Sequence, residues 1–148
     1  MKFEIFNSGD FIRIEEIKTS FLDAEMDWDK NWLLAKIAIK AGSFSGQFNA
    51  NFMTTDFEML KRDLKNLNIN FSGTAHFEPL ENQVSLKISG DGLGHFDVNC
   101  TAIDEPGCGV KLIFTLNFDQ TELSRLINEL EIITKSFPIK GDLEITNE

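Results

Sequence analysis

The sequence predicts an α+β fold of about eight mostly antiparallel strands and two amphipathic helices. Three observations lead to this prediction. Apolar and polar residues alternate with period two through most of the 148-residue chain. Two segments instead place their apolar residues at helical spacing. The strand end and helix of the first half also match those of the second half at an offset of 66 residues.

Strict alternation gives a strand one buried face and one wet face, which is typical of antiparallel sheets. In residues 44–52, Phe44, Phe48 and Phe52 point one way, and polar residues point the other. The alternation recurs at residues 33–40, 71–77, 84–88, 96–102 and 110–118. Turn-forming sequences separate these segments at residues 7–10, 40–43, 79–82, 91–94 and 105–109. The turns divide the chain into about eight strands.

Two segments have helical periodicity, and we expect helices near residues 56–67 and 121–136. The first puts Phe57, Leu60, Leu64 and Leu67 on one face, and the second does the same with Leu123, Leu126, Ile127, Leu130 and Ile133. Thr55 is the candidate N-cap of the first helix, with Glu58 three residues later as in a capping box. Pro138 ends the second.

The match between the halves predicts an internal repeat of four strands and a helix. Asn51–Phe52 aligns with Asn117–Phe118, and Thr55–Asp56 aligns with Thr121–Glu122. Amphipathic periodicity alone would not produce the matched Asn-Phe and Thr-acid pairs. We expect one domain over residues 1–148, with structural halves 1–68 and 69–140. The tail, residues 138–148, either adds a short terminal strand or frays.

The charge of the chain is strongly negative. Its 24 acidic and 14 basic residues give a formal net charge of −10, and most of the excess lies in the second half. Nucleic-acid phosphates would repel such a protein, so direct DNA or RNA binding is not expected. A basic protein partner would be attracted. No apolar run approaches a membrane span and no secretory signal opens the chain, so we expect a cytoplasmic protein whose two cysteines stay reduced.

The acidic segment, residues 23–29 with sequence DAEMDWD, is the main candidate site. Its acids at alternate positions, Asp23, Glu25, Asp27 and Asp29, are similar to the start of a calcium-binding loop. However, Trp28 stands where that loop needs glycine, and a strand follows, so no metal site is expected. Two interpretations remain. Trp28 is either a partly exposed anchor for a basic protein surface or a packed residue beside a loop of solvated acids, whereas Trp32 is expected to pack at the start of a strand.

Catalytic chemistry has little support in the sequence. His76 and His95 are the only histidines, and neither has a cysteine or carboxylate at the spacing of a known metal or nucleophile site. The glycines of residues 90–94 join two strands and do not open a helix, so they predict a hairpin and not a phosphate-binding loop. We expect no enzyme activity, no catalytic residues and no cofactor.

One stretch resembles the signature of a known family. Residues 27–33 read D-W-D-K-N-W-L, and their D-x-D-x-N-W-L pattern is similar to that of the WapI family of bacterial immunity proteins. Shorter matches are FEP at residues 77–79 and FP at residues 137–138. The resemblance implies a small cytoplasmic protein that binds the C-terminal toxic domain of a protein delivered by neighbouring bacteria. In the namesake system that domain attacks RNA.

The expected function is therefore an immunity protein that binds a cognate basic toxin domain, a nuclease being one candidate. Partner-binding residues would be Asp23, Glu25, Asp27, Trp28 and Asp29. The alternative is a non-catalytic binding or structural module of unrelated purpose, with a small apolar ligand held between sheet and helices. The sequence leaves the oligomeric state open.

Overall fold

The structure, a computed structural model, describes residues 1–21 and 23–141 of the chain. The strands are β1 (Lys2–Asn7), β2 (Asp10–Thr19), β3 (Trp32–Ala41), β4 (Phe44–Met53), β5 (Ser72–Phe77), β6 (Val84–Asp91), β7 (His95–Ile103) and β8 (Lys111–Asp119). The helices are α1 (Asp27–Lys30), α2 (Thr54–Asn70), the 3₁₀ turn η1 (Gln120–Glu122) and α3 (Leu123–Ser136). The terminal strand considered for the tail falls largely on residues 142–148, outside the described residues.

The strands form two four-stranded sheets, each with its strands in chain order. Sheet 1 has the order β1-β2-β3-β4, and sheet 2 has the order β5-β6-β7-β8. All six strand pairings are antiparallel. Each sheet is followed by a helix, α2 after sheet 1 and α3 after sheet 2. The predicted α+β fold, with its repeat of four strands and a helix, is therefore confirmed.

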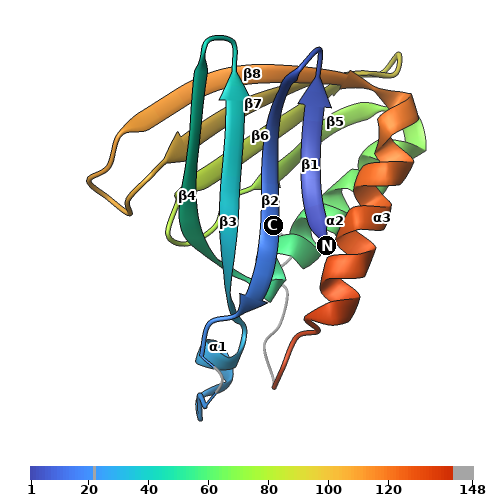
Figure 1. The fold of residues 1–148 in the computed structure, drawn as a ribbon. Coiled ribbons are helices and arrows are strands. Elements are labelled where there is room, and N and C mark those ends of the chain that lie inside the picture. The colour runs from blue at the N-terminus through green and yellow to red at the C-terminus, as the bar shows by residue number, and fades with distance from the viewer. Residues whose placement is uncertain (22, 142–148) are drawn as a thin grey trace.

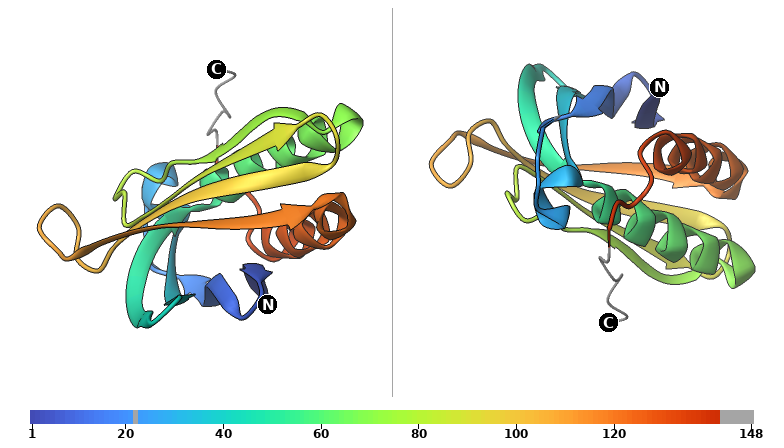
Figure 2. Two further views of the ribbon diagram at one scale, coloured as in Figure 1. Left: turned by 90° about the horizontal axis from the view of Figure 1, so that it is seen from above. Right: turned by 90° about the horizontal axis from the view of Figure 1, so that it is seen from below.

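The two sheets pack face to face with their strands crossing steeply (Figure 1). Helices α2 and α3 lie beside each other at one side of the sheets, where α3 runs next to β1 (Figures 1 and 2). Lys65 of α2 and Glu131 of α3 form an ion pair of 2.5 Å between these helices. Both helices present one apolar face to the sheets, and this tertiary packing supplies most of the stability of a helix in a folded protein.

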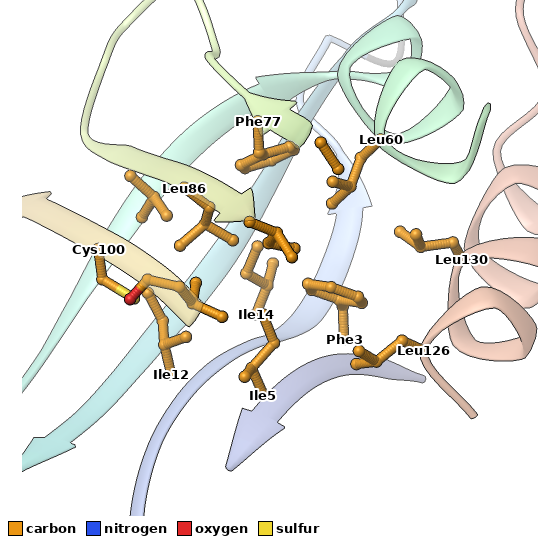
Figure 3. Close-up of a cluster of buried hydrophobic side chains, with 14 of the residues drawn as sticks. Phe3, Ile5, Ile12, Ile14, Leu60, Phe77, Leu86, Cys100, Leu126 and Leu130 are labelled. Carbon is orange, nitrogen blue, oxygen red and sulfur yellow. The ribbon is translucent and has the colours of Figure 1, made fainter. Parts of the chain in front are cut away.

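One hydrophobic core joins both sheets and both long helices. Phe3, Ile5, Ile12 and Ile14 of sheet 1 face Phe77, Leu86 and Cys100 of sheet 2, while Leu60, Leu126 and Leu130 enter from the helices (Figure 3). Phe52, Phe57 and Phe77 form an aromatic cluster with ring centres 5.4–5.7 Å apart. Side chains from both sheets and both long helices thus meet in this core.

The predicted start of the first long helix is wrong by two residues. The N-cap is Met53 and not Thr55, and the helix begins at Thr54. The carboxylate of Asp56 accepts a hydrogen bond from the Met53 N–H at 2.7 Å, whereas Glu58 pairs with Lys61. The reason is tertiary, because the Thr54 N–H donates to the carbonyl of Asn31, which draws the chain into the helix earlier.

The two cysteines are free thiols, as expected. Cys100 is buried in β7, and burial raises its pKa to about 12. Cys108 is exposed in the turn between β7 and β8. Within residues 1–21 and 23–141, no helix is long and apolar enough to cross a membrane.

Candidate partner-binding segment

The acidic segment lies in the connection between β2 and β3, at one end of sheet 1 (Figure 1). The sequence predicts an exposed loop here, but residues 27–30 form the single helical turn α1. Lys30 donates its backbone N–H to Met26 O at 3.2 Å, and Asn31 donates to Trp28 O at 3.3 Å. The turn gives the segment a defined conformation instead of an open loop.

Large apolar side chains are exposed on and beside this segment. Trp28 is 47% exposed, Met26 is 68% exposed, and Phe21, just before the segment, is 53% exposed. Exposed aromatic and methionine side chains are typical of protein interfaces, where they supply buried contact area. The partial exposure of Trp28 agrees with the anchor interpretation and not with the interpretation of Trp28 as a packed residue.

The acidic side chains of the segment differ in their surroundings. Asp23 and Glu25 are exposed, and Asp29 is half-buried. Phe21, Ala24, Asp23 and Asp29 line a shallow depression on the surface. Carboxylates beside exposed apolar groups suit a basic surface that also offers apolar contact. The structure thus brings Asp23 and Asp29 together at one hollow.

Both the carboxylate and the backbone carbonyl of Asp27 make contacts within the protein. Its carboxylate lies 3.2 Å from Lys30 Nζ, and its backbone carbonyl accepts a hydrogen bond from the Asn31 side chain at 2.6 Å. Gly141 packs so closely against the Asp27 side chain that an added Cβ would overlap the carboxyl group. These contacts assign Asp27 a part in holding the segment in place.

Asn31 is a residue that the sequence analysis quoted but gave no role. It is only 1% exposed. Its side-chain amide donates to the carbonyls of Asp27 and Lys140, and its side-chain oxygen accepts from the Lys140 N–H at 2.8 Å. Because each of these hydrogen bonds goes to a backbone group, the buried Asn31 side chain links separate segments of the chain. The only sequence signal was its position inside the D-x-D-x-N-W-L pattern.

Trp32 begins β3 and is 9% exposed, so the expectation that it packs at the strand start is correct. Its carbonyl accepts the backbone N–H of Ser20 at 2.9 Å, and it stands opposite Met53 in the pairing of β3 with β4. The two tryptophans, four residues apart, therefore have different surroundings. Trp28 is about half exposed to solvent, and Trp32 is buried.

The histidines lie on exposed strand positions. His95 Nδ1 is 2.9 Å from a carboxylate oxygen of Asp91, and His76 Nδ1 is 3.5 Å from one of Glu78. Hydrogen bonds from the backbone N–H groups of His95 and Leu93 hold the pKa of Asp91 below its usual range. Within the described ranges, no group of three or more His, Cys, Asp or Glu side chains is arranged to hold a metal ion.

Comparison with known sequence families shows which family the chain matches. The model of the "Immunity protein WapI-like family" covers residues 3–138, which include the acidic segment and both long helices. The chain belongs to the WapI-like immunity protein family. The family resemblance drawn from residues 27–33 is thus confirmed. No curated protein matches the chain.

Solved structures resemble this member of the WapI-like family in fold. The MRP1/MRP2 structure from Trypanosoma bruciei matches with a TM-score of 0.51 and 11% identity, over 92% of this chain and 83% of that one. WHY1 from Arabidopsis thaliana gives a TM-score of 0.48 and 15% identity, over 94% and 85%. The plant transcriptional regulator PBF-2 gives 0.47 and 13%, over 95% and 90%. At such identities the likeness concerns the fold alone.

Two parts of the family pattern have clear structural roles here. Asn31 ties the acidic segment to the C-terminal chain, and Trp32 starts the central strand β3. The shorter matches lie at element ends. Phe77 closes β5 inside the aromatic cluster, and Phe137 follows α3 and packs against the core. Much of the pattern therefore maintains the fold.

Proposed function

We propose that this chain is a cytoplasmic immunity protein that binds a toxin domain and blocks it by covering its working surface. Membership of an immunity protein family supports a protective role for the chain. Binding, and not catalysis, is the proposed mode of action. The protein needs no cofactor for it, and we infer no direct contact with nucleic acid or membrane.

The partner we infer is basic. A net charge of −10 gives the molecule a field that draws in a positively charged protein and speeds its encounter. A nuclease is a natural candidate, because it must attract phosphates with basic side chains. Carboxylates placed over those side chains would exclude the nucleic acid.

The contact we propose is the acidic segment, with Trp28 as its apolar anchor. The observation that carries this assignment is a tryptophan exposed over 47% of its surface among acidic side chains. Aromatic side chains that become buried at an interface dominate binding energy, whereas charges around them mainly guide the approach. Asp23 and Glu25 would guide, Trp28 would anchor, and Asp29 would line the rim. Asp27 would act by shaping the segment.

The test requires a candidate toxin domain, which would be sought as the variable C-terminal domain of a large secreted protein encoded beside the gene of this chain. We expect a stable complex and loss of the toxin's activity on mixing the two purified proteins. For a nuclease toxin, a short oligonucleotide should compete with the immunity protein for the toxin. Absence of a complex at micromolar concentrations would refute the proposed function.

Hydrogen exchange of the same complex tests the assignment of the site. Backbone amides of residues 23–31 should become protected when the toxin binds. Amides on the exposed face of sheet 2, such as those near Asp97 and Asn99, should not. Protection on sheet 2 with none in residues 23–31 would show that the immunity role is right but the site is wrong.

A further inference from the structure

We propose that Asn31 and the C-terminal segment, residues 137–141, form a brace that holds the acidic segment in its binding conformation. The inference rests on the proposed function for its consequence in toxin binding. Its structural part, the restraint of residues 23–31 by the C-terminal segment, is independent of any partner. Asn31 and Gly141 are positioning residues in this proposal, since neither is itself placed at the toxin.

The C-terminal segment is anchored at its start. Phe137 packs against the hydrophobic core, and its N–H donates to Ile133 O at 2.9 Å. The chain then leaves α3 and runs toward α1, where Lys140 meets Asn31 through two hydrogen bonds of 2.9 and 2.8 Å. The segment is therefore fixed to the core at one end and to the acidic segment at the other.

Asn31 is the point at which three parts of the chain meet. Its side chain joins the α1 carbonyl of Asp27 to both backbone groups of Lys140, and its own carbonyl accepts the Thr54 N–H at 3.0 Å. Only an amide can donate to the carbonyls and accept from the N–H at the same place. Replacing Asn31 leaves several buried polar groups unpaired, which is costly in the closed form and cheap in an opened one.

Gly141 allows the C-terminal segment to approach α1 closely. Its φ of +77° lies in the left-handed region that favours glycine. An added Cβ would also overlap the carboxyl group of Asp27, so any larger residue pushes the C-terminal segment away from α1. Backbone conformation and close packing at this one position both require glycine.

A four-residue helix needs such support. An isolated turn of this length is far below the length at which helices are stable in water. No side chain of α1 itself is buried. The defined conformation around Trp28 therefore depends on tertiary contacts, and the brace supplies those on the side of Asp27.

The chain offers matched controls for both variants. Gln83 is a second buried amide, 2% exposed, whose Nε2 donates to the carbonyls of Asn49, Ile103 and Asp104. It ties sheet 1 to sheet 2 and has no bond to residues 23–31. Gly107 has a φ of +76°, almost the value of Gly141, but an added Cβ there meets nothing within 4 Å. Gln83→Ala and Gly107→Ala thus repeat the chemical changes away from the brace.

The experiment measures hydrogen exchange of residues 23–31 in the free, full-length protein. Asn31→Ala and Gly141→Ala should each speed that exchange by about tenfold, the factor expected when one or two net hydrogen bonds are lost. Gln83→Ala and Gly107→Ala should leave it unchanged. Unchanged exchange in both brace variants would overturn the proposal.

Toxin binding gives the second readout. Opening the segment lowers the fraction of molecules ready to bind, so in each brace variant the affinity for the toxin domain should fall in proportion to the closed fraction that its exchange rates give. An unaltered affinity in a variant whose exchange shows the segment to be mostly open would overturn the positioning role and show that the segment is not the toxin contact. If the wild-type chain binds no toxin, the proposed function fails, and the exchange data alone still decide whether the brace exists.

Discussion

The guanidinium group of Arg125 lies 4.6 Å from the centre of the Phe6 ring, which joins α3 to the edge strand β1. The same side chain donates to the backbone carbonyl of Glu4 at 2.9 Å and is held by Glu122 and Glu129 at 2.9 and 2.7 Å. One arginine therefore fastens the last element of the fold to the first. A planar group with several donors can make all these contacts at once, and a lysine cannot.

Replacing Arg125 should loosen this junction. We expect Arg125→Ala to lower the free energy of unfolding by about 2 kcal/mol, because the Glu4 carbonyl loses its donor and Phe6 loses its cation. Arg125→Lys should recover less than half of the loss. Urea unfolding measures both effects. A lysine variant as stable as the wild type would mean that charge alone matters at this site.

Much of the fold could be predicted because it follows from local patterns. Period-two alternation marks strands in which every second side chain is buried, and helical spacing marks α2 and α3. The tight turn at residues 7–10 could be predicted from its own residues, because glycine suits the positive φ that Ser8 and Gly9 both adopt there. The start of α2 could not be predicted, because it depends on the bond from Thr54 to Asn31, 23 positions earlier in the chain.

The candidate site was only partly predictable for the same reason. Burial of Trp32 follows from its position at the start of a periodic strand, whereas the sequence left the exposure of Trp28 open. The separate role of Asp27 does not follow from such a position, because Gly141, at the other end of the sequence, packs against its side chain. The Asn31 side chain that binds the Asp27 carbonyl is itself held by Lys140. Local sequence identifies the acidic segment but not the residues that hold it.

The two tryptophans should respond differently to removal. Trp28→Ala should speed dissociation of the toxin complex and cost on the order of 2 kcal/mol of binding energy, with little change in stability. Trp32→Ala should lower the free energy of unfolding by roughly 3 kcal/mol or more, because it empties a buried site at the start of β3. Dissociation kinetics and urea unfolding of each variant separate the two effects.

Phe44 provides the control for Trp28. It is also an exposed aromatic residue, but it lies at the β3–β4 turn, at the opposite end of sheet 1 from α1 (Figure 1). Phe44→Ala should leave toxin dissociation unchanged. If Trp28→Ala instead unfolds the protein and the folded fraction keeps its affinity, the acidic segment is structural and its binding role is wrong.

Neutralising the exposed acids of the segment should slow association. The Asp23→Asn, Glu25→Gln double variant should reduce the association rate by at most about tenfold at low ionic strength and flatten its salt dependence. Asp97→Asn with Glu105→Gln changes the net charge equally on sheet 2 and its β7–β8 turn, and it should have a smaller effect. Equal effects of the two pairs would show that overall charge, and not this segment, guides the toxin.

Asp56 at the start of α2 should make stability fall as the pH rises. Burial raises its pKa to about 6, although the bond from the Met53 N–H opposes the shift. The folded protein therefore holds this proton more tightly than the unfolded chain, whose aspartate titrates near 3.9. The contribution of the Asp56 proton to stability is complete below a pH of about 3.9, the unfolded pKa, and is lost as the pH rises through about 6. Between pH 4 and pH 7 this group should remove about 2 kcal/mol of stability.

Asp56→Asn isolates this contribution, because the amide oxygen can still accept the Met53 N–H but cannot titrate. Asp119 provides a control of opposite sign. Bonds from the hydroxyl and N–H of Thr121 hold the pKa of Asp119 below its usual range, so its contribution is present at neutral pH and lost on acidification. In urea unfolding, Asp56→Asn should gain stability relative to wild type as the pH rises from 4 to 7. Asp119→Asn should be less stable than wild type at neutral pH, and this difference should shrink below pH 4, because only the wild type loses the Asp119 contribution there. Parallel curves for wild type and Asp56→Asn would mean that the carboxylate of Asp56 is solvated in the folded protein.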